Sequence, residues 1–233
     1  MPGKFQTGNE EVDRQFGGSL PFPSLMLLEG DHGTGKSAMV ALFMQGLLES
    51  GKKVLCITEN TVKDYIENMK AITYNFSTAF LQNRLTIMPL HVYGINWSKE
   101  QSAYLLPVIG KYISNSFKET NAVIIDSLSL LTVFADETKI LDFFTQCKYL
   151  VANGMSIILT IHPNDISSDI AQRVTGSVDV YLKLGLTSIG GIDVKTMKIV
   201  KLIGAEVKPE SNFAFEVDQS FGIKVVPIST ANA

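Results

Sequence analysis

The chain has 233 residues, 45% hydrophobic and 18% charged, a composition that fits a folded domain and excludes a disordered chain. Its net charge of −3 argues against a protein held to nucleic acid by bulk electrostatics, and no apolar run approaches the ~18–20 residues of a membrane span. The amino terminus lacks the pattern of a secretion signal, and the two cysteines, Cys56 and Cys147, form no metal-binding cluster. We therefore expect one cytoplasmic domain over residues 1–233, with reduced thiols in its core.

Short apolar runs alternate with longer segments of helical periodicity, as in consecutive β-α-β units. The apolar runs predict strands at Leu25–Glu29, Val54–Thr58, Leu85–Leu90, Ala122–Asp126 and Ser156–Ile161. The periodic segments predict helices at Ser37–Ser50, Thr61–Ala71, Lys99–Lys118 and Asp136–Asn153. Thr61 and Asp136 are expected to cap their helices, and Pro107 is expected to interrupt or kink the third one.

The pattern changes from Val178 onward. The segments VYLKL, VKTMKIVKLIG, NFAFEV and GIKVVPI alternate in the manner of β-strands, with turns between them. The predicted fold class is α/β, with a mostly parallel central sheet flanked by helices and C-terminal antiparallel β-hairpins.

A phosphate-binding loop stands between the first predicted strand and helix. The segment GDHGTGKS matches G-x-x-x-x-G-K-[ST] and predicts these cofactor-binding residues: Gly30, Asp31, His32, Gly33, Thr34, Gly35, Lys36 and Ser37. The glycines let backbone N–H groups turn toward phosphate oxygens, and the following helix directs its positive end at the same anion. Lys36 is expected to bind the β- and γ-phosphates, and the Ser37 hydroxyl to ligate Mg²⁺.

Polar residues at three other strand ends are further candidates, because the carboxyl ends of parallel strands meet at one edge of the sheet. Asp126 is expected to reach Mg²⁺ through water; the alternative is that it caps the following turn. Glu59 is the candidate catalytic base, unless it merely opens the next helix. His162 and Thr160 are candidates for contact with the γ-phosphate; the alternative for His162 is a side chain satisfied by nearby backbone.

Several segments fit one family. They are Thr7-Gly8, Asp13, Gly17-Gly18 and Leu20-Pro21 before the loop, VLCITEN after it, and KIVKLIGAE with FEVDQSFGIKVVP near the end. Together they resemble the RecA-superfamily ATPases of the KaiC type, nearly from end to end. The resemblance implies a RecA-like phosphate-loop NTPase core that binds ATP with Mg²⁺.

Within that superfamily, a single domain of this length is similar to the FlaH (ArlH) group of the archaeal flagellum, or archaellum. The strand end Thr160-Ile161-His162-Pro163, the pair Glu59-Asn60 and the segment KLIG fit this group. The resemblance implies a regulatory or assembly component that engages the motor ATPase (FlaI), a cytosolic ring or scaffold and the membrane platform protein. It also implies a homo-oligomer, such as a hexameric ring, held at the inner face of the membrane through partners.

The chain departs from active KaiC-type domains at two places. Those domains carry two adjacent acids after the second strand, whereas this chain has Glu59 and Asn60. They also carry Lys-x-Arg on a C-terminal strand, reaching the neighbouring subunit's site, whereas this chain has Lys201 and Ile203. Because a guanidinium supplied in trans is worth about 10³–10⁵ in rate in other phosphate-loop systems, we expect binding with little or no hydrolysis.

Other functions remain open from the sequence. An active KaiC-like ATPase or autokinase is the alternative, with Ser229 and Thr230 as weak candidate acceptors. A recombinase would need basic loops, but the segments SLSLLTVFADET and PNDISSD are apolar or acidic, so no nucleic-acid partner is expected. Lys195 and Lys198 are interpreted as part of a solvated strand edge.

Overall fold

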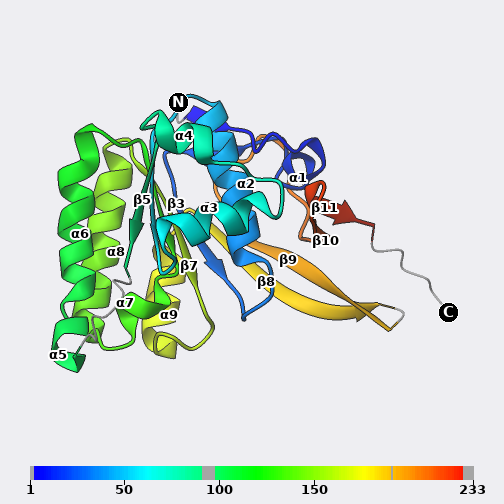
Figure 1. The fold of residues 1–233 in the computed structure, drawn as a ribbon. Helices are drawn as coiled ribbons and strands as arrows, with labels where there is room; N and C mark the ends of the chain where they lie inside the picture. Colours follow the sequence, from blue (N-terminus) through cyan, green and yellow to red (C-terminus); the bar gives the residue numbers. More distant parts are fainter. Residues whose placement is uncertain (1–2, 91–97, 190, 228–233) are drawn as a thin grey trace.

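The architecture is a nine-stranded sheet with helices on both faces, seen in a computed structural model that describes residues 3–90, 98–189 and 191–227 (Figure 1). The strand order is β11-β10-β9-β8-β3-β7-β6-β4-β5. The bounds are β3 Leu25–Glu29, β4 Val54–Thr58, β5 Leu85–Pro89, β6 Ala122–Asp126, β7 Ser156–Ile161, β8 Val180–Ile189, β9 Ile192–Leu202, β10 Asn212–Asp218 and β11 Gly222–Val226. The strands from β8 to β5 pair in parallel, whereas β9, β10 and β11 pair antiparallel. Two short strands, β1 (Gly3–Phe5) and β2 (Leu20–Phe22), form a separate antiparallel pair.

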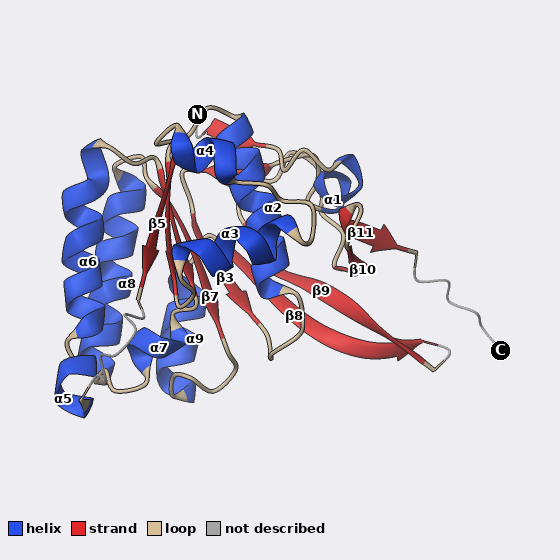
Figure 2. Ribbon diagram, in the orientation of Figure 1, coloured by secondary structure: helices blue, strands red, loops and turns tan. Residues whose placement is uncertain are grey.

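Each face of the large sheet carries its own hydrophobic core, and the helices in Figure 2 cover both faces. Against one face pack α1 (Glu10–Gln15), α2 (Lys36–Glu49), α3 (Val62–Lys70) and α4 (Ser77–Leu81). Against the other pack α6 (Leu105–Asn115), α7 (Ser129–Thr132), α8 (Glu137–Ala152) and α9 (Ser168–Ser177). The remaining helical segments are α5 (Lys99–Ser102) and the 3₁₀ turn η1 (Ser116–Lys118). Because β6 and β7 are covered on both sides, their residues are apolar almost without alternation, as is typical of parallel sheets.

The helix α2 is the central element of the first core. Most of its side chains are buried, including Met39, Phe43 and Leu47, because the sheet lies beneath it and the amino-terminal segment passes over it. The close approach of that segment requires Gly46, where a Cβ atom would lie 2.2 Å from the Gln6 carbonyl oxygen. The packing therefore holds the first turn of α2 firmly at the carboxyl edge of the sheet.

The structure confirms most predicted elements. The strands β3, β4, β6 and β7 have the predicted bounds, and the Thr61 and Asp136 side chains accept hydrogen bonds from Asp64 N and Lys139 N, as expected of helix caps. The segment predicted to be mostly helical and interrupted over 99–118 divides into α5, α6 and η1. The break between α5 and α6 lies just before Pro107, and the proline itself stands in the first turn of α6, where backbone N–H groups have no intrahelical partner.

Other predictions concern the thiols, the membrane and the chain end. Cys56 and Cys147 are buried free cysteines, as predicted, and burial raises the pKa of the Cys56 thiol to about 12. Over the described ranges, no helix combines the length and the apolar character needed to cross a bilayer. The candidate acceptors Ser229 and Thr230 lie outside the described residues.

Candidate nucleotide-binding site

The phosphate loop connects the carboxyl end of β3 to the first turn of α2, as predicted. Gly33 and Gly35 adopt φ values of +78° and +93°, which favour glycine. At Gly30 a Cβ atom would lie 2.7 Å from the Leu184 carbonyl oxygen, so β8 leaves no room for a side chain. The Thr34 hydroxyl closes the turn by donating to the Asp31 carbonyl oxygen at 2.7 Å. The loop thus presents its backbone N–H groups together with the positive end of α2.

A cavity of about 510 Å³ lies over this loop. The residues that line it come from the carboxyl ends of β3, β4, β6 and β7, from the first turn of α2, and from β9 and β10: Asp31, His32, Gly33, Gly35, Lys36, Ser37, Ala38, Glu59, Asn60, Asp126, Ser127, His162, Lys195 and Val217. The predicted residues Gly30 and Thr34 belong to the loop but not to the cavity wall. The cavity lies at the carboxyl edge of the parallel strands, where open α/β sheets bind their ligands.

The Lys36 side chain is buried beneath the loop. Its ammonium group donates to the carbonyl oxygens of Gly30 at 2.5 Å and Asp31 at 2.9 Å, and lies 3.3 Å from His162 Nδ1. Burial lowers the pKa of the Lys36 ammonium group, although the charge of Asp126 opposes this shift. The lysine is thus held within the loop as a point charge for an anion.

Asp126 ends β6 as a buried carboxylate, and its Oδ1 accepts a hydrogen bond from the Thr160 hydroxyl at 2.8 Å. Thr160 does not line the cavity; it lies on β7 behind the carboxylate and fixes its orientation. On the cavity side, the exposed Ser37 supplies a hydroxyl oxygen. Within the described ranges, no group of three His, Cys, Asp or Glu residues could hold a metal ion. This sparse oxygen donor set fits Mg²⁺, which keeps several waters and binds through one or two protein groups plus substrate phosphates.

His162 lines the cavity at the end of β7, as predicted. Its ring centroid lies 3.9 Å from that of His32, and its backbone N–H donates to Asp165 Oδ2 at 3.0 Å. Burial lowers the pKa of the His162 imidazole, and the charges of Lys36 and His32 lower it further, against the opposing effect of Asp165 and Asp31. The neutral ring is therefore favoured beside Lys36.

This shift predicts a pH dependence of stability. The His162 pKa lies below its ordinary value of 6.5 in the folded protein, so below that pH the unfolded chain binds the proton first. The unfolding free energy should fall as the pH drops below about 6.5, with no contribution from His162 above it. Urea unfolding of the wild type and of His162→Gln at about pH 7.5 and pH 5.5 measures this. The variant should lose less stability on acidification; an equal loss in both proteins would contradict the prediction.

The comparisons with known proteins point to one family. The sequence profile of the KaiC ATPases matches residues 5–230. The chain is 40% identical over 228 residues to the archaeal flagellar ATP-binding protein FlaH of Sulfolobus acidocaldarius, covering 97% of this chain and 98% of that protein. The chain belongs to the FlaH group of the KaiC-type ATPases.

More distant relatives share the same architecture. FlaH of Methanocaldococcus jannaschii is 26% identical over 98% of this chain and 97% of its own length. The crystal structure of the FlaH protein from that organism superposes with a TM-score of 0.85 at 23% identity, covering 97% of this chain and all of that chain. A KaiC-like protein from Pyrococcus horikoshii superposes with a TM-score of 0.77 at 20% identity and the same coverage. These structures support the RecA-like fold.

Two positions of this FlaH-group chain bear on hydrolysis. Glu59 follows β4 and lines the cavity together with Asn60, so both lie at the predicted edge of the sheet. The Asn60 side-chain amide lies 3.4 Å from the Thr58 hydroxyl, the acceptor of its hydrogen bond. The position next to Glu59 therefore holds a neutral amide within the cavity.

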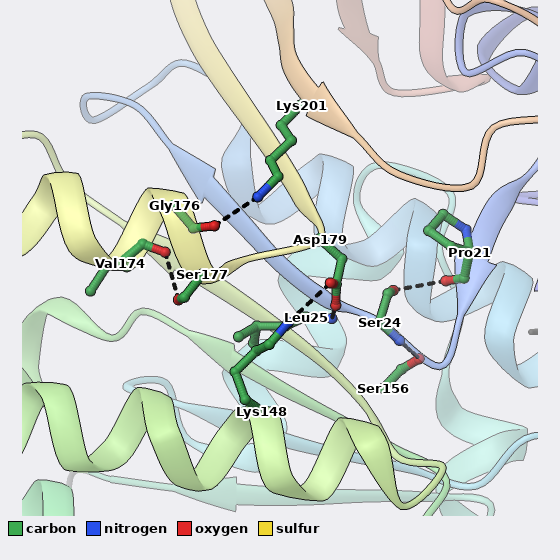
Figure 3. A network of polar contacts seen from close by, with 10 residues as sticks. All are labelled: Pro21, Ser24, Leu25, Lys148, Ser156, Val174, Gly176, Ser177, Asp179 and Lys201. Atoms are coloured by element: carbon green, nitrogen blue, oxygen red, sulfur yellow. Dashed lines mark hydrogen bonds and ion pairs between the residues drawn. The ribbon is translucent and has the colours of Figure 1, made fainter.

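Lys201 lies at the opposite edge of the sheet from its own phosphate loop. Figure 3 shows its ammonium group donating to the Gly176 carbonyl oxygen at 2.8 Å, near the start of β3. Nearby, Ile203 is 54% exposed and its N–H donates to the Asp179 carbonyl oxygen. Within one subunit these two residues cannot serve the site over Gly30–Ser37. A role for Lys201 in a neighbouring subunit's site stays a prediction.

The sequence pattern predicts that Lys195 belongs to a solvated strand edge, but the structure places this residue in the cavity wall. The strand period alone puts it on the face opposite to Lys198, without showing that this face meets the phosphate loop. The pairing of β9 with β8 and β10 decides the matter, and that pairing was not predictable from local pattern.

Proposed function

We propose that the protein binds Mg-ATP and serves as an ATP-binding regulatory or assembly component of the archaellum motor. The observation that supports this most directly is the complete phosphate-binding apparatus. The loop, the buried Lys36, the exposed Ser37 hydroxyl and the Asp126 carboxylate held by Thr160 surround one cavity. The curated relatives named above are described as archaeal flagellar ATP-binding proteins.

We propose further that hydrolysis by the protein alone is weak or absent. Glu59 lines the cavity and is the carboxylate that we propose to orient an attacking water, but its neighbour Asn60 cannot act as a second acid. Ile203 is apolar and cannot supply a guanidinium to a neighbouring site, which removes a large electrostatic contribution to phosphoryl transfer. ATP would then act by binding one conformation or oligomer better than another, and a few kcal/mol of difference is enough for a switch.

Binding and turnover should be measured together on one purified sample with Mg²⁺. We expect tight ATP binding with turnover well below about 1 s⁻¹, which is the low end of ordinary enzymes. Size-exclusion chromatography with and without nucleotide would report the oligomer. Turnover at about 1 s⁻¹ or faster that is lost in Glu59→Gln would contradict the switch and establish an active ATPase. Phosphoprotein formed in isolation would instead establish an autokinase.

We propose partners on the resemblance to the FlaH group. They are the motor ATPase (FlaI), the cytosolic ring or scaffold and the membrane platform protein, with further copies of the same chain in a ring. We propose a cytoplasmic location at the inner face of the membrane, reached through these partners. ATP-dependent co-elution with the purified motor ATPase tests the first contact. Co-elution that is unaffected by ATP would contradict the nucleotide-dependent part of the proposal.

A further inference from the structure

Lys195 lies where β9 passes the phosphate loop. Its Cα pairs with those of Leu186 on β8 and Phe215 on β10. Along β9 it shares a face with Met197, which is fully buried in the core beneath α2. Its half-buried side chain therefore lies at the margin of that core, beside the first turn of α2, where it lines the cavity.

The stem of Lys195 packs against the loop itself. A Cβ atom at Gly35 would lie 3.3 Å from Lys195 Cδ and 3.0 Å from the Phe215 ring. Gly35 is the last residue before α2, so the lysine stem runs past the positive end of that helix. Of the ion pairs formed between described residues, none involves the Lys195 ammonium group. A second cation is thus placed beside an anion-binding loop.

The sheet order indicates which phosphate this cation meets. The strand β3, which leads into the loop, stands between β7-β6-β4 on one side and β8-β9-β10 on the other. Asp126 and Glu59 line the cavity from β6 and β4, where the metal and the γ-phosphate are expected. Lys195 lines it from β9 on the other side, beside the part of the loop whose N–H groups cradle the α- and β-phosphates.

We propose that Lys195 is a second phosphate-binding cation, which contacts the α- or β-phosphate of a nucleotide bound in the same subunit. This inference rests on the proposed binding of ATP. It assigns Lys195 a role in holding ADP and ATP alike, in contrast to groups on the Asp126 side, which distinguish the two nucleotides through the γ-phosphate.

The test is the affinity for Mg-ADP and Mg-ATP, measured by calorimetry at two salt concentrations. Lys195→Met removes the charge but keeps an apolar stem against Gly35, and we expect it to weaken both nucleotides by about tenfold to hundredfold. Its affinity should also depend less on salt, because one ion pair is lost. Lys195→Arg should restore most of the binding, and Lys198→Met, an exposed change on the other face of β9, should bind like the wild type.

The inference would be overturned if Lys195→Met bound both nucleotides with an affinity within about twofold of the wild type. It would also be overturned if this variant lost affinity for ATP alone, or if Lys195→Met and Lys198→Met lost affinity equally. A wild-type protein that binds neither nucleotide would instead refute the proposed function. Thermal unfolding without nucleotide should be alike for the wild type and Lys195→Met, which separates lost contacts from lost folding.

Discussion

Replacing Lys36 by alanine should weaken Mg-ATP binding by about hundredfold or more, because each charge-assisted hydrogen bond to a phosphate is worth about 1.5–3 kcal/mol and the ammonium group can make more than one. In the structure this group donates to the Gly30 and Asp31 carbonyl oxygens within the loop, and Lys36 itself lines the cavity. Burial lowers the pKa of the ammonium group, and the negative charge of a bound phosphate would raise it again. Calorimetric titration with Mg-ATP measures the loss.

A matched control for this change is Lys63→Ala, because the Lys63 side chain is 79% exposed on α3 and forms a long ion pair with Glu67. This control should bind ATP like the wild type, since a surface ion pair of this kind is worth at most about 1 kcal/mol. Affinity of Lys36→Ala within about threefold of the control would contradict the assignment of Lys36 to the phosphates.

Replacing Phe43 by alanine should lower the free energy of unfolding by about 3–5 kcal/mol, the usual cost of truncating a buried phenylalanine. The Phe43 side chain lies on α2 with no exposed surface, and its ring packs edge-on against Phe16 at a centroid distance of 5.8 Å. The truncation removes this aromatic contact and leaves a cavity between α2 and the amino-terminal segment. Urea unfolding at neutral pH measures the change.

The same chemical change at Phe221 serves as the control, because that side chain is 76% exposed at the turn between β10 and β11. Phe221→Ala should alter the unfolding free energy by no more than about 0.5 kcal/mol. Comparable losses in the two variants would show that α2 does not form the core of the domain. A combined loss of folding and nucleotide binding in Phe43→Ala is consistent with the structure, because α2 also carries Lys36 and Ser37.

The nucleotide site was predictable to the extent that its residues follow one another along the chain or end neighbouring strands. The loop from Gly30 to Ser37 is contiguous, and Asp126, Glu59 and His162 end strands that local pattern identifies. Thr160 was placed in the correct strand, but its hydroxyl turns to Asp126 and not to the cavity. The direction of the Thr160 hydroxyl depends on how β7 lies beside β6, and the local sequence pattern does not predict that arrangement.

The α/β class, the phosphate loop and the strands of the parallel core could be predicted from the amino-acid sequence, because they depend on short-range signals: apolar runs, glycine positions and helix caps. The pairing of the antiparallel strands could not, and this pairing places two lysines of β9 in different surroundings. Lys195 joins the phosphate cavity, whereas Lys201 lies near Gly176 at the far edge. The physical reason is that strand register is set by packing between segments distant in the chain, so the same residue type on one strand meets different surroundings.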